Sequence, residues 1–154
     1  MAFEPSDKIG GLSEDELRRF LAEPWTARIA TVTTDGWPYL TPVWYEYEAA
    51  RRCFLIVGRE RAEWVRHIRA TARVALHVAD DFRAQHTRVL VQGRAEIVEG
   101  PIAPATSPRL GELTDRLSLR YLGANGPAYA ARTAGRPRVL VRVVPERWRT
   151  WTGQ

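Results

Sequence analysis

The sequence is short of cysteine and of uninterrupted apolar segments, and each shortage excludes a class of structure. The single Cys53 excludes an intrachain disulfide and a cysteine-cluster metal site. Its place in the apolar run of residues 53–57 predicts a packed core thiol rather than a reactive one. No apolar run approaches the length that crosses a bilayer, and residues 1–11 lack the basic-then-apolar pattern of a signal peptide. We therefore expect a cytoplasmic protein that does not enter membranes.

Histidine is also scarce. The three histidines, His67, His77 and His86, stand at no metal-ligand spacing. We therefore expect structural or exposed histidines and no metal site. The polar residues form no recognisable catalytic triad either, so we assign no catalytic residue.

What is abundant is arginine and tryptophan. The 154 residues suit one domain and carry a net charge of +5, with a pI near 10, which is compatible with an anionic ligand or with nucleic acid. The basic residues are spread along the chain without a dense basic tail, and this favours one local anion site over a nucleic-acid surface. Six tryptophans are many for this length, and such flat rings often line ligand sites.

Residues 28–47 read as two long strands joined by a tight turn. Residues 28–34 alternate as a strand does, with Ile29, Thr31 and Thr33 on one side, and the second stretch is rich in aromatic and β-branched residues. Asp35 and Gly36 supply the turn, because both tolerate the positive φ that tight hairpins need. Pro42 predicts an edge strand or a bulge, since proline cannot donate to a central ladder.

The other elements follow from caps and periodicity. Ser13 and Glu16 form a capping box at the start of a first helix that stops near Pro24. Further helices are expected over residues 59–69, from Ser107 onward, and over 127–133. Further strands are expected over residues 53–57, 73–79, 87–98 and 138–144. Gly93 inside the clearest strand predicts a bulge or a close approach of other backbone. About six mostly antiparallel strands with a few helices indicate a small barrel.

A candidate anion site follows the strand at residues 53–57. Gly58 ends that strand, and a helix beginning with Arg59 and Arg61 would place free amides and two guanidinium groups together. An ordinary solvated helix start is the alternative explanation. Replacing both arginines tests the choice between them.

Several short motifs, in this order and spacing, resemble the pyridoxamine 5'-phosphate oxidase-like split β-barrel proteins, which bind flavin. The resemblance covers about residues 21–151. The motifs that carry it are TTDGWP (33–38), TPVW (41–44), VRHI (65–68), RVAL (73–76), VQGRAE (91–96) and RVLVRV (138–143) followed by PER (145–147).

The resemblance implies a mostly β fold with flanking helices, namely a six-stranded antiparallel split β-barrel of the FMN-binding type. We expect one domain over residues 1–154, with an N-terminal helical segment (1–24) and a C-terminal tail (145–154). It also implies a homodimer with cofactor sites at the subunit interface, and a small-molecule substrate. Most members bind FMN, one branch uses the deazaflavin F-420, and some bind haem.

The predicted cofactor-binding residues combine the family's positions with the neighbouring arginines and tryptophans. They are Thr41, Pro42, Val43, Trp44, Val57, Gly58, Arg59, Arg61, Trp64, Arg66, Arg88 and Trp148. The family's phosphate-binding serine and lysine are missing, because this chain reads Ala62-Glu63-Trp64 there. Three alternatives stay open: Arg59, Arg61 and Arg66 hold the anion instead, the cofactor differs, or there is none.

The sequence therefore predicts an FMN-dependent oxidoreductase that transfers hydride to or from a small organic molecule. A deazaflavin-dependent reductase on the same fold is the alternative, since its acidic tail suits the additional arginines. A non-catalytic haem-binding or nucleic-acid-binding protein is the third reading. For haem, His67 is the only candidate axial ligand beside the proposed site.

Overall fold

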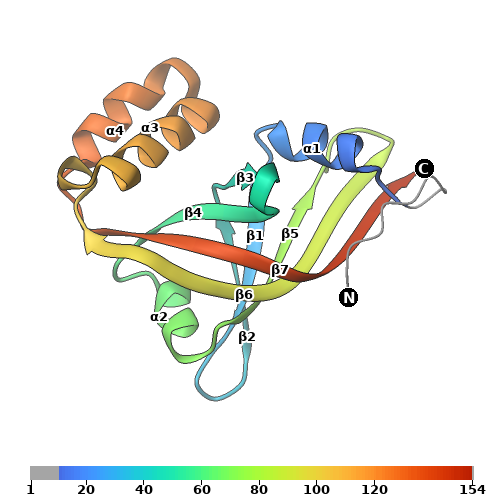
Figure 1. Cartoon of the computed structure of the whole chain (residues 1–154), viewed down its shortest axis with the longest axis horizontal. Helices are drawn as coiled ribbons and strands as arrows, with labels where there is room; N and C mark the ends of the chain where they lie inside the picture. The colour runs from blue at the N-terminus through green and yellow to red at the C-terminus, as the bar shows by residue number, and fades with distance from the viewer. Residues whose placement is uncertain (1–10, 154) are drawn as a thin grey trace.

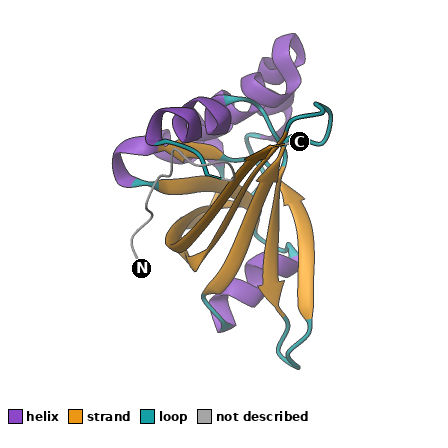
Figure 2. Ribbon diagram, turned by 90° about the vertical axis from the view of Figure 1, so that its right-hand side faces the viewer, coloured by secondary structure: helices purple, strands orange, loops and turns teal. Residues whose placement is uncertain are grey.

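The computed structural model describes residues 11–153, which are built around one curved antiparallel sheet (Figures 1 and 2). Its strands are β1 (Ala27–Val32), β2 (Pro38–Val43), β3 (Glu46–Glu48), β4 (Cys53–Arg59), β5 (Arg73–Ala79), β6 (His86–Ile102) and β7 (Arg138–Gly153). They lie in the order β2-β1-β5-β6-β7-β4-β3. The expected mostly β, antiparallel, split-barrel-like fold is confirmed, but the described chain forms an open sheet of seven strands and not a six-stranded barrel.

The additional strand arises because the second half of the expected hairpin divides. β2 pairs with β1 only as far as Val43, and β3 then pairs with β4 at the opposite edge of the sheet. Tyr45 lies between them with its side chain fully buried. Its hydroxyl donates to the Leu21 carbonyl oxygen at 3.0 Å, and burial raises the pKa of this phenol. The buried ring fixes the point where the chain crosses from one edge to the other.

The helices are α1 (Glu14–Ala22), α2 (Glu63–Ala70), α3 (Pro108–Leu122) and α4 (Gly126–Thr133), with short 3₁₀ turns at Ala49–Arg51, Pro104–Thr106 and Gly123–Asn125. The capping box at Ser13 and Glu16 is confirmed, as is the Ser107-Pro108 start of α3. The α3–α4 hairpin lies beyond one end of the long β6–β7 pair, and α2 lies on the other side of the strands (Figures 1 and 2). No helix among residues 11–153 has the length and apolar character needed to cross a membrane.

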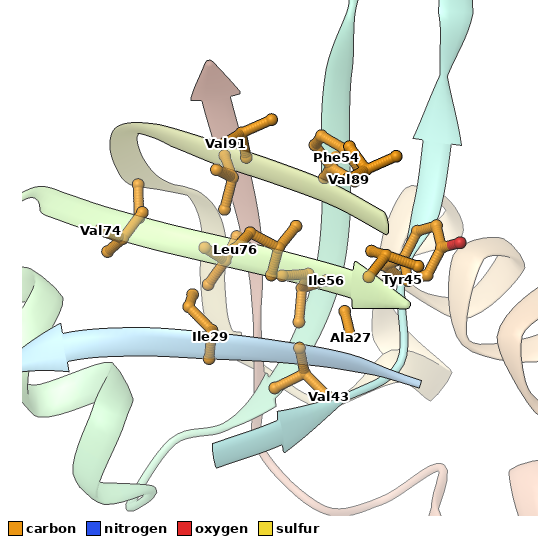
Figure 3. Packing of buried hydrophobic residues seen from close by; sticks show 14 of the residues in the cluster. Ala27, Ile29, Val43, Tyr45, Phe54, Ile56, Val74, Leu76, Val89 and Val91 are labelled. Carbon is orange, nitrogen blue, oxygen red and sulfur yellow. The ribbon is translucent and has the colours of Figure 1, made fainter. Parts of the chain in front are cut away.

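The main hydrophobic core gathers buried side chains from the strands, α1 and α2, and Figure 3 shows part of it in close-up. Alternate residues of each strand point into it, as the period-2 pattern predicts. The side chains that Figure 3 labels are Ala27, Ile29, Val43, Tyr45, Phe54, Ile56, Val74, Leu76, Val89 and Val91. Cys53 is buried, as expected of a packed thiol. Burial also raises the pKa of this thiol, which keeps it in the unreactive protonated form.

Two of the boundaries that differ from the sequence-based expectation concern the predicted tail and the predicted anion site. β7 does not end at Val144 but continues to Gly153, so residues 145–153 are strand rather than tail. The helix expected from Arg59 begins only at Glu63, because β4 continues through Arg59 and a turn closes with a hydrogen bond from the Ala62 amide to the Arg59 carbonyl oxygen (3.0 Å). The two arginines therefore precede α2 and are not part of its first turn.

Candidate functional site

The ends of β2 and β4 meet the α3–α4 hairpin around a cavity of about 370 Å³. The sheet side supplies the end of β2 with Trp44, the end of β4, the start of α2, and the first residue of β7. The helical side supplies one face of α3 and Tyr129 of α4. The lining residues are Thr26, Pro42, Val43, Trp44, Val57, Gly58, Arg59, Ala62, Trp64, Thr114, Leu117, Ser118, Tyr129 and Arg138. This is the size and mixed character of a small-molecule site.

Aromatic rings form much of the cavity wall and are held by their neighbours. Trp44 stacks on Tyr121, with ring centroids 5.1 Å apart and an interplanar angle of 4°. The edge of Tyr129 meets Trp44 at 5.9 Å. Tyr121 is in turn anchored by a hydrogen bond from its hydroxyl to the Trp25 carbonyl oxygen (2.7 Å), and burial raises the pKa of that hydroxyl. The wall is thus fixed to both α3 and the start of β1.

Trp64 forms a second aromatic part of the wall, and its position depends on Gly58. A Cβ atom at Gly58 would lie 2.8 Å from the Trp64 ring and 2.8 Å from Val65 Cγ2. Only glycine allows α2 to pack this closely against the end of β4. Trp64 is 6% exposed, so its ring both packs in the core and borders the cavity.

A buried cation lies in the same cavity. Arg138, the first residue of β7, is 7% exposed and is paired across the sheet with Arg59, the last residue of β4. Among residues 11–153, neither side chain has an ion pair or hydrogen bond with another side chain. Burying a charge without a partner is costly. The cavity is therefore suited to an anionic group.

A second hollow, of about 550 Å³, adjoins the first. It is lined by Arg59, Glu60, Arg61, Arg136, Pro137 and Arg138, so that Arg59 and Arg138 border both hollows. The Glu60 amide approaches the Pro137 carbonyl oxygen at 3.5 Å and brings the β4–α2 turn beside the loop before β7. Four arginines and one glutamate make this hollow strongly basic, which favours a ligand with several negative charges.

The structure brings together seven of the twelve predicted cofactor-binding residues at the cavity, from Pro42–Trp44, Val57–Arg59 and Trp64. Arg61 lines only the adjoining hollow. Thr41 lies on β2 next to Pro42 but is not part of the lining. Whether any of them binds a cofactor stays a prediction.

The remaining three predicted residues lie elsewhere. Arg66 pairs with Glu63 on the exposed side of α2. Arg88 is exposed on β6, opposite Trp151 of β7. Trp148 packs against Tyr47 of β3 and Phe54 at the start of β4, with ring centroids 6.1 and 5.9 Å away, whereas the cavity lies at the end of β4. Within this chain none of them lines the cavity.

His67 is not placed to ligate a group in the cavity. It is 5% exposed, its Nδ1 lies 2.8 Å from the Thr31 hydroxyl, and Tyr39 packs edge-on against its ring at 5.0 Å. It is absent from the lining of the cavity. This is the structural role expected for it. Among the residues described, no three His, Cys, Asp or Glu side chains gather as a metal site would require.

Sequence reasoning missed the contributions of β7 and the helical hairpin, chiefly Arg138, Ser118 and Tyr129. Arg138 carried a signal: it shares a strand face with Leu140, which is fully buried. Thr114 and Ser118 flank the apolar stripe of α3 at i, i+4 spacing. Neither signal reveals which part of the sheet these residues face.

The comparisons with known proteins concern almost the whole chain. A family profile described as pyridoxamine 5'-phosphate oxidase matches residues 13–152. A conserved hypothetical protein from Mycobacterium tuberculosis is 26% identical, with a TM-score of 0.72 over 97% of this chain and 90% of that one. An F420 reductase is 27% identical, with a TM-score of 0.62 over 85% and 94%.

A heme storage protein from Vibrio cholerae shares the fold, with 18% identity and a TM-score of 0.69 over 91% of this chain and 96% of that one. No curated protein is detectably similar to the sequence.

Proposed function

Because this chain belongs to the pyridoxamine 5'-phosphate oxidase-like family, we propose that it is an oxidoreductase that binds a flavin-type cofactor in the cavity between β4 and the α3–α4 hairpin. The cofactor we propose first is FMN. A bound flavin would supply two-electron hydride transfer to or from a small organic substrate, and the protein would supply placement and electrostatics.

The observation that carries the proposal is Arg138, a residue 7% exposed that lines an aromatic-walled cavity without an ion-pair partner among the described residues. An unpaired buried charge calls for a counter-ion, and a flavin phosphate provides one. The cavity of about 370 Å³ and its aromatic wall of Trp44, Tyr129 and Trp64 are compatible with a flat ring system. The residues present therefore fit the group.

Arg138 also accounts for the missing phosphate-binding motif. The chain has Ala62 and Trp64 where the family has its serine and lysine; the alanine side chain has no donor, and the tryptophan offers one weak donor at most. In our proposal Arg138 and Arg59 bind the anion in their place. A guanidinium pair is a suitable replacement because it can bind phosphate oxygens in a bidentate manner.

A deazaflavin-dependent reductase is the second candidate, and the basic hollow next to the cavity favours it. Arg61 and Arg136 extend the positive surface beyond Arg59 and Arg138. A cofactor with a long acidic tail would use that extension, whereas FMN has a single phosphate. The 27% identity to an F420 reductase supports this candidate as well.

Haem binding has less support. The fold is shared with a heme storage protein, but the one histidine near the cavity is already engaged with Thr31 and Tyr39. Nucleic-acid binding has none beyond the net charge of +5.

We further propose that the protein is a cytoplasmic homodimer. Trp37 and Leu40 on the β2 hairpin are 69% and 66% exposed, as residues that pack against a second copy would be. Sedimentation velocity would show a single species of twice the monomer mass; a monomer at micromolar concentration would refute the proposal.

The proposed function is tested by a visible absorption spectrum of the purified protein, followed by separate titrations with FMN and F-420. A flavin spectrum or saturable FMN uptake supports the first candidate. Uptake of F-420 alone supports the second. If neither binds, the proposal of an oxidoreductase fails.

Replacing Arg59 and Arg61 together with alanine should weaken cofactor binding about tenfold and change the free energy of unfolding by less than about 1 kcal/mol. Both side chains are exposed, so they add little to stability, but both border the basic hollow. The measurements are a cofactor titration and urea unfolding of each variant.

The matched control is the double replacement of Arg18 and Arg19, which removes the same charge from α1, an element that lines neither hollow. Equal losses of affinity in the two double variants would mean that net charge alone, and no local site, attracts the cofactor.

A further inference from the structure

The hydroxyl group of Ser118 forms no hydrogen bond with the other residues that the structure describes. Ser118 lies on α3, is 1% exposed, and lines the cavity. Its Oγ is buried and has no hydrogen-bond partner among residues 11–153. A buried hydroxyl in this state is uncommon, because it has lost its water and gained nothing in return.

The same helix shows how such a hydroxyl is usually satisfied. One turn earlier, Thr114 donates to the Leu110 carbonyl oxygen at 2.7 Å. Thr133 on α4 does the same with the Tyr129 carbonyl oxygen at 3.0 Å. Serine and threonine within helices commonly make this bond to the preceding turn. Ser118 does not, so its hydroxyl remains available for another partner.

The position of Ser118 is fixed by the packing of α3 against α4. At Gly126 a Cβ atom would lie 2.6 Å from the backbone C and O atoms of Ser118, so the two helices are in close contact there. Two residues farther along α3, Arg120 donates to the Leu21 carbonyl oxygen at 3.0 Å and ties α3 to the end of α1. A hydroxyl held this firmly can contribute to recognition without first being ordered.

We propose that Ser118 is a specificity-determining residue of the cavity, whose hydroxyl forms a hydrogen bond with a carbonyl oxygen or ring nitrogen of the bound ligand. This inference rests on the proposed function. The ligand then needs two features, an anionic group for Arg138 and a neutral hydrogen-bonding atom that faces α3. A phosphorylated heteroaromatic compound has both. The α3–α4 hairpin then selects the ring system as well as covering it.

The test is Ser118→Ala, with separate titrations of FMN and F-420 and thermal unfolding of the cofactor-free protein. We expect the dissociation constant of the bound cofactor to rise about tenfold, the equivalent of one buried hydrogen bond. The cofactor-free variant should melt at the same temperature as the parent or higher, because a buried polar group without a partner has been removed. The absorption maximum of the bound ring should also shift, since a polar contact with it is lost.

The control is Thr133→Val, which removes a buried hydroxyl of the same hairpin that is already bonded and does not line the cavity. It should lower the melting temperature and leave the dissociation constant within about twofold. Two outcomes would refute the role of Ser118 and leave the proposed function standing. In the first, the parent binds a cofactor and Ser118→Ala binds it equally well. In the second, Ser118→Ala has a lower melting temperature than the parent and binds the cofactor no more weakly than the control does. If the parent binds neither cofactor, the proposed function fails and this inference with it.

Discussion

Replacing Arg138 with glutamine should weaken cofactor binding about 100-fold, because charge-assisted hydrogen bonds to an anion contribute about 1.5–3 kcal/mol each. Among residues 11–153, Arg138 is the one basic residue that lines the cavity and is itself buried. The cofactor-free variant should be at least as stable as the parent, since a buried charge without a partner has been removed. Cofactor titration and urea unfolding measure the two effects separately.

Two further variants sharpen this prediction. Arg138→Lys keeps the charge but not the planar fork, so it should retain only part of the affinity. Arg142→Gln is the control: it lies on the same strand, but its side chain pairs with Glu96 at 2.7 Å and does not line the cavity. Its dissociation constant for the cofactor should lie within about twofold of the parent's. If Arg138→Gln binds as tightly as Arg142→Gln, the anion lies elsewhere.

Elements with a local signal were predictable from the sequence. The capping box at Ser13, the Asp35-Gly36 turn and the proline start of α3 each depend on residues a few positions apart, and the structure confirms all three. Gly36 has a φ of 89°, as the turn requires. The strands expected at the start of the hairpin and over residues 73–79 are likewise present, as β1 and β5.

The errors came from tertiary contacts that override local pattern. The last strand was expected to end at Val144, but β7 continues past Pro145, where Gly93 of β6 lies opposite and the ladder shifts register. Alternating charge over residues 59–69 resembled one helix, whereas the partnership of β4 with β7 extends β4 through Arg59. Pairing between strands far apart in the chain decided both cases.

Only the part of the candidate site that β2 and β4 supply was predictable from the sequence. Residues of β2 and β4 were found through the family resemblance, because their motifs are contiguous. Arg138 and Ser118 could not be found, because their place depends on which strand lies beside β4 and on how α3 packs over the sheet. Both are also polar residues in surroundings that bury them, which is the kind of local inconsistency that functional sites show.

Gly93→Ala should be strongly destabilising, with a loss of about 3 kcal/mol or more in the free energy of unfolding. A Cβ atom there would lie 2.1 Å from the Val144 carbonyl oxygen and 2.9 Å from Pro145 Cα. Both are backbone atoms, so no side-chain rotation relieves the clash, and the β6–β7 ladder itself must open. That ladder joins the two halves of the sheet order.

Gly135→Ala is the matched control for this change, because no heavy atom of the described residues lies within 4 Å of a Cβ at that position. It should change the free energy of unfolding by less than about 1 kcal/mol, measured in the same urea series through the shift in midpoint at constant slope. The contrast isolates the close approach of two strands from the general cost of replacing glycine. A loss below about 1 kcal/mol for Gly93→Ala would mean that β7 does not pack this closely against the bulge, and the β6–β7 register that sets Gly93 opposite Pro145 would then need revision.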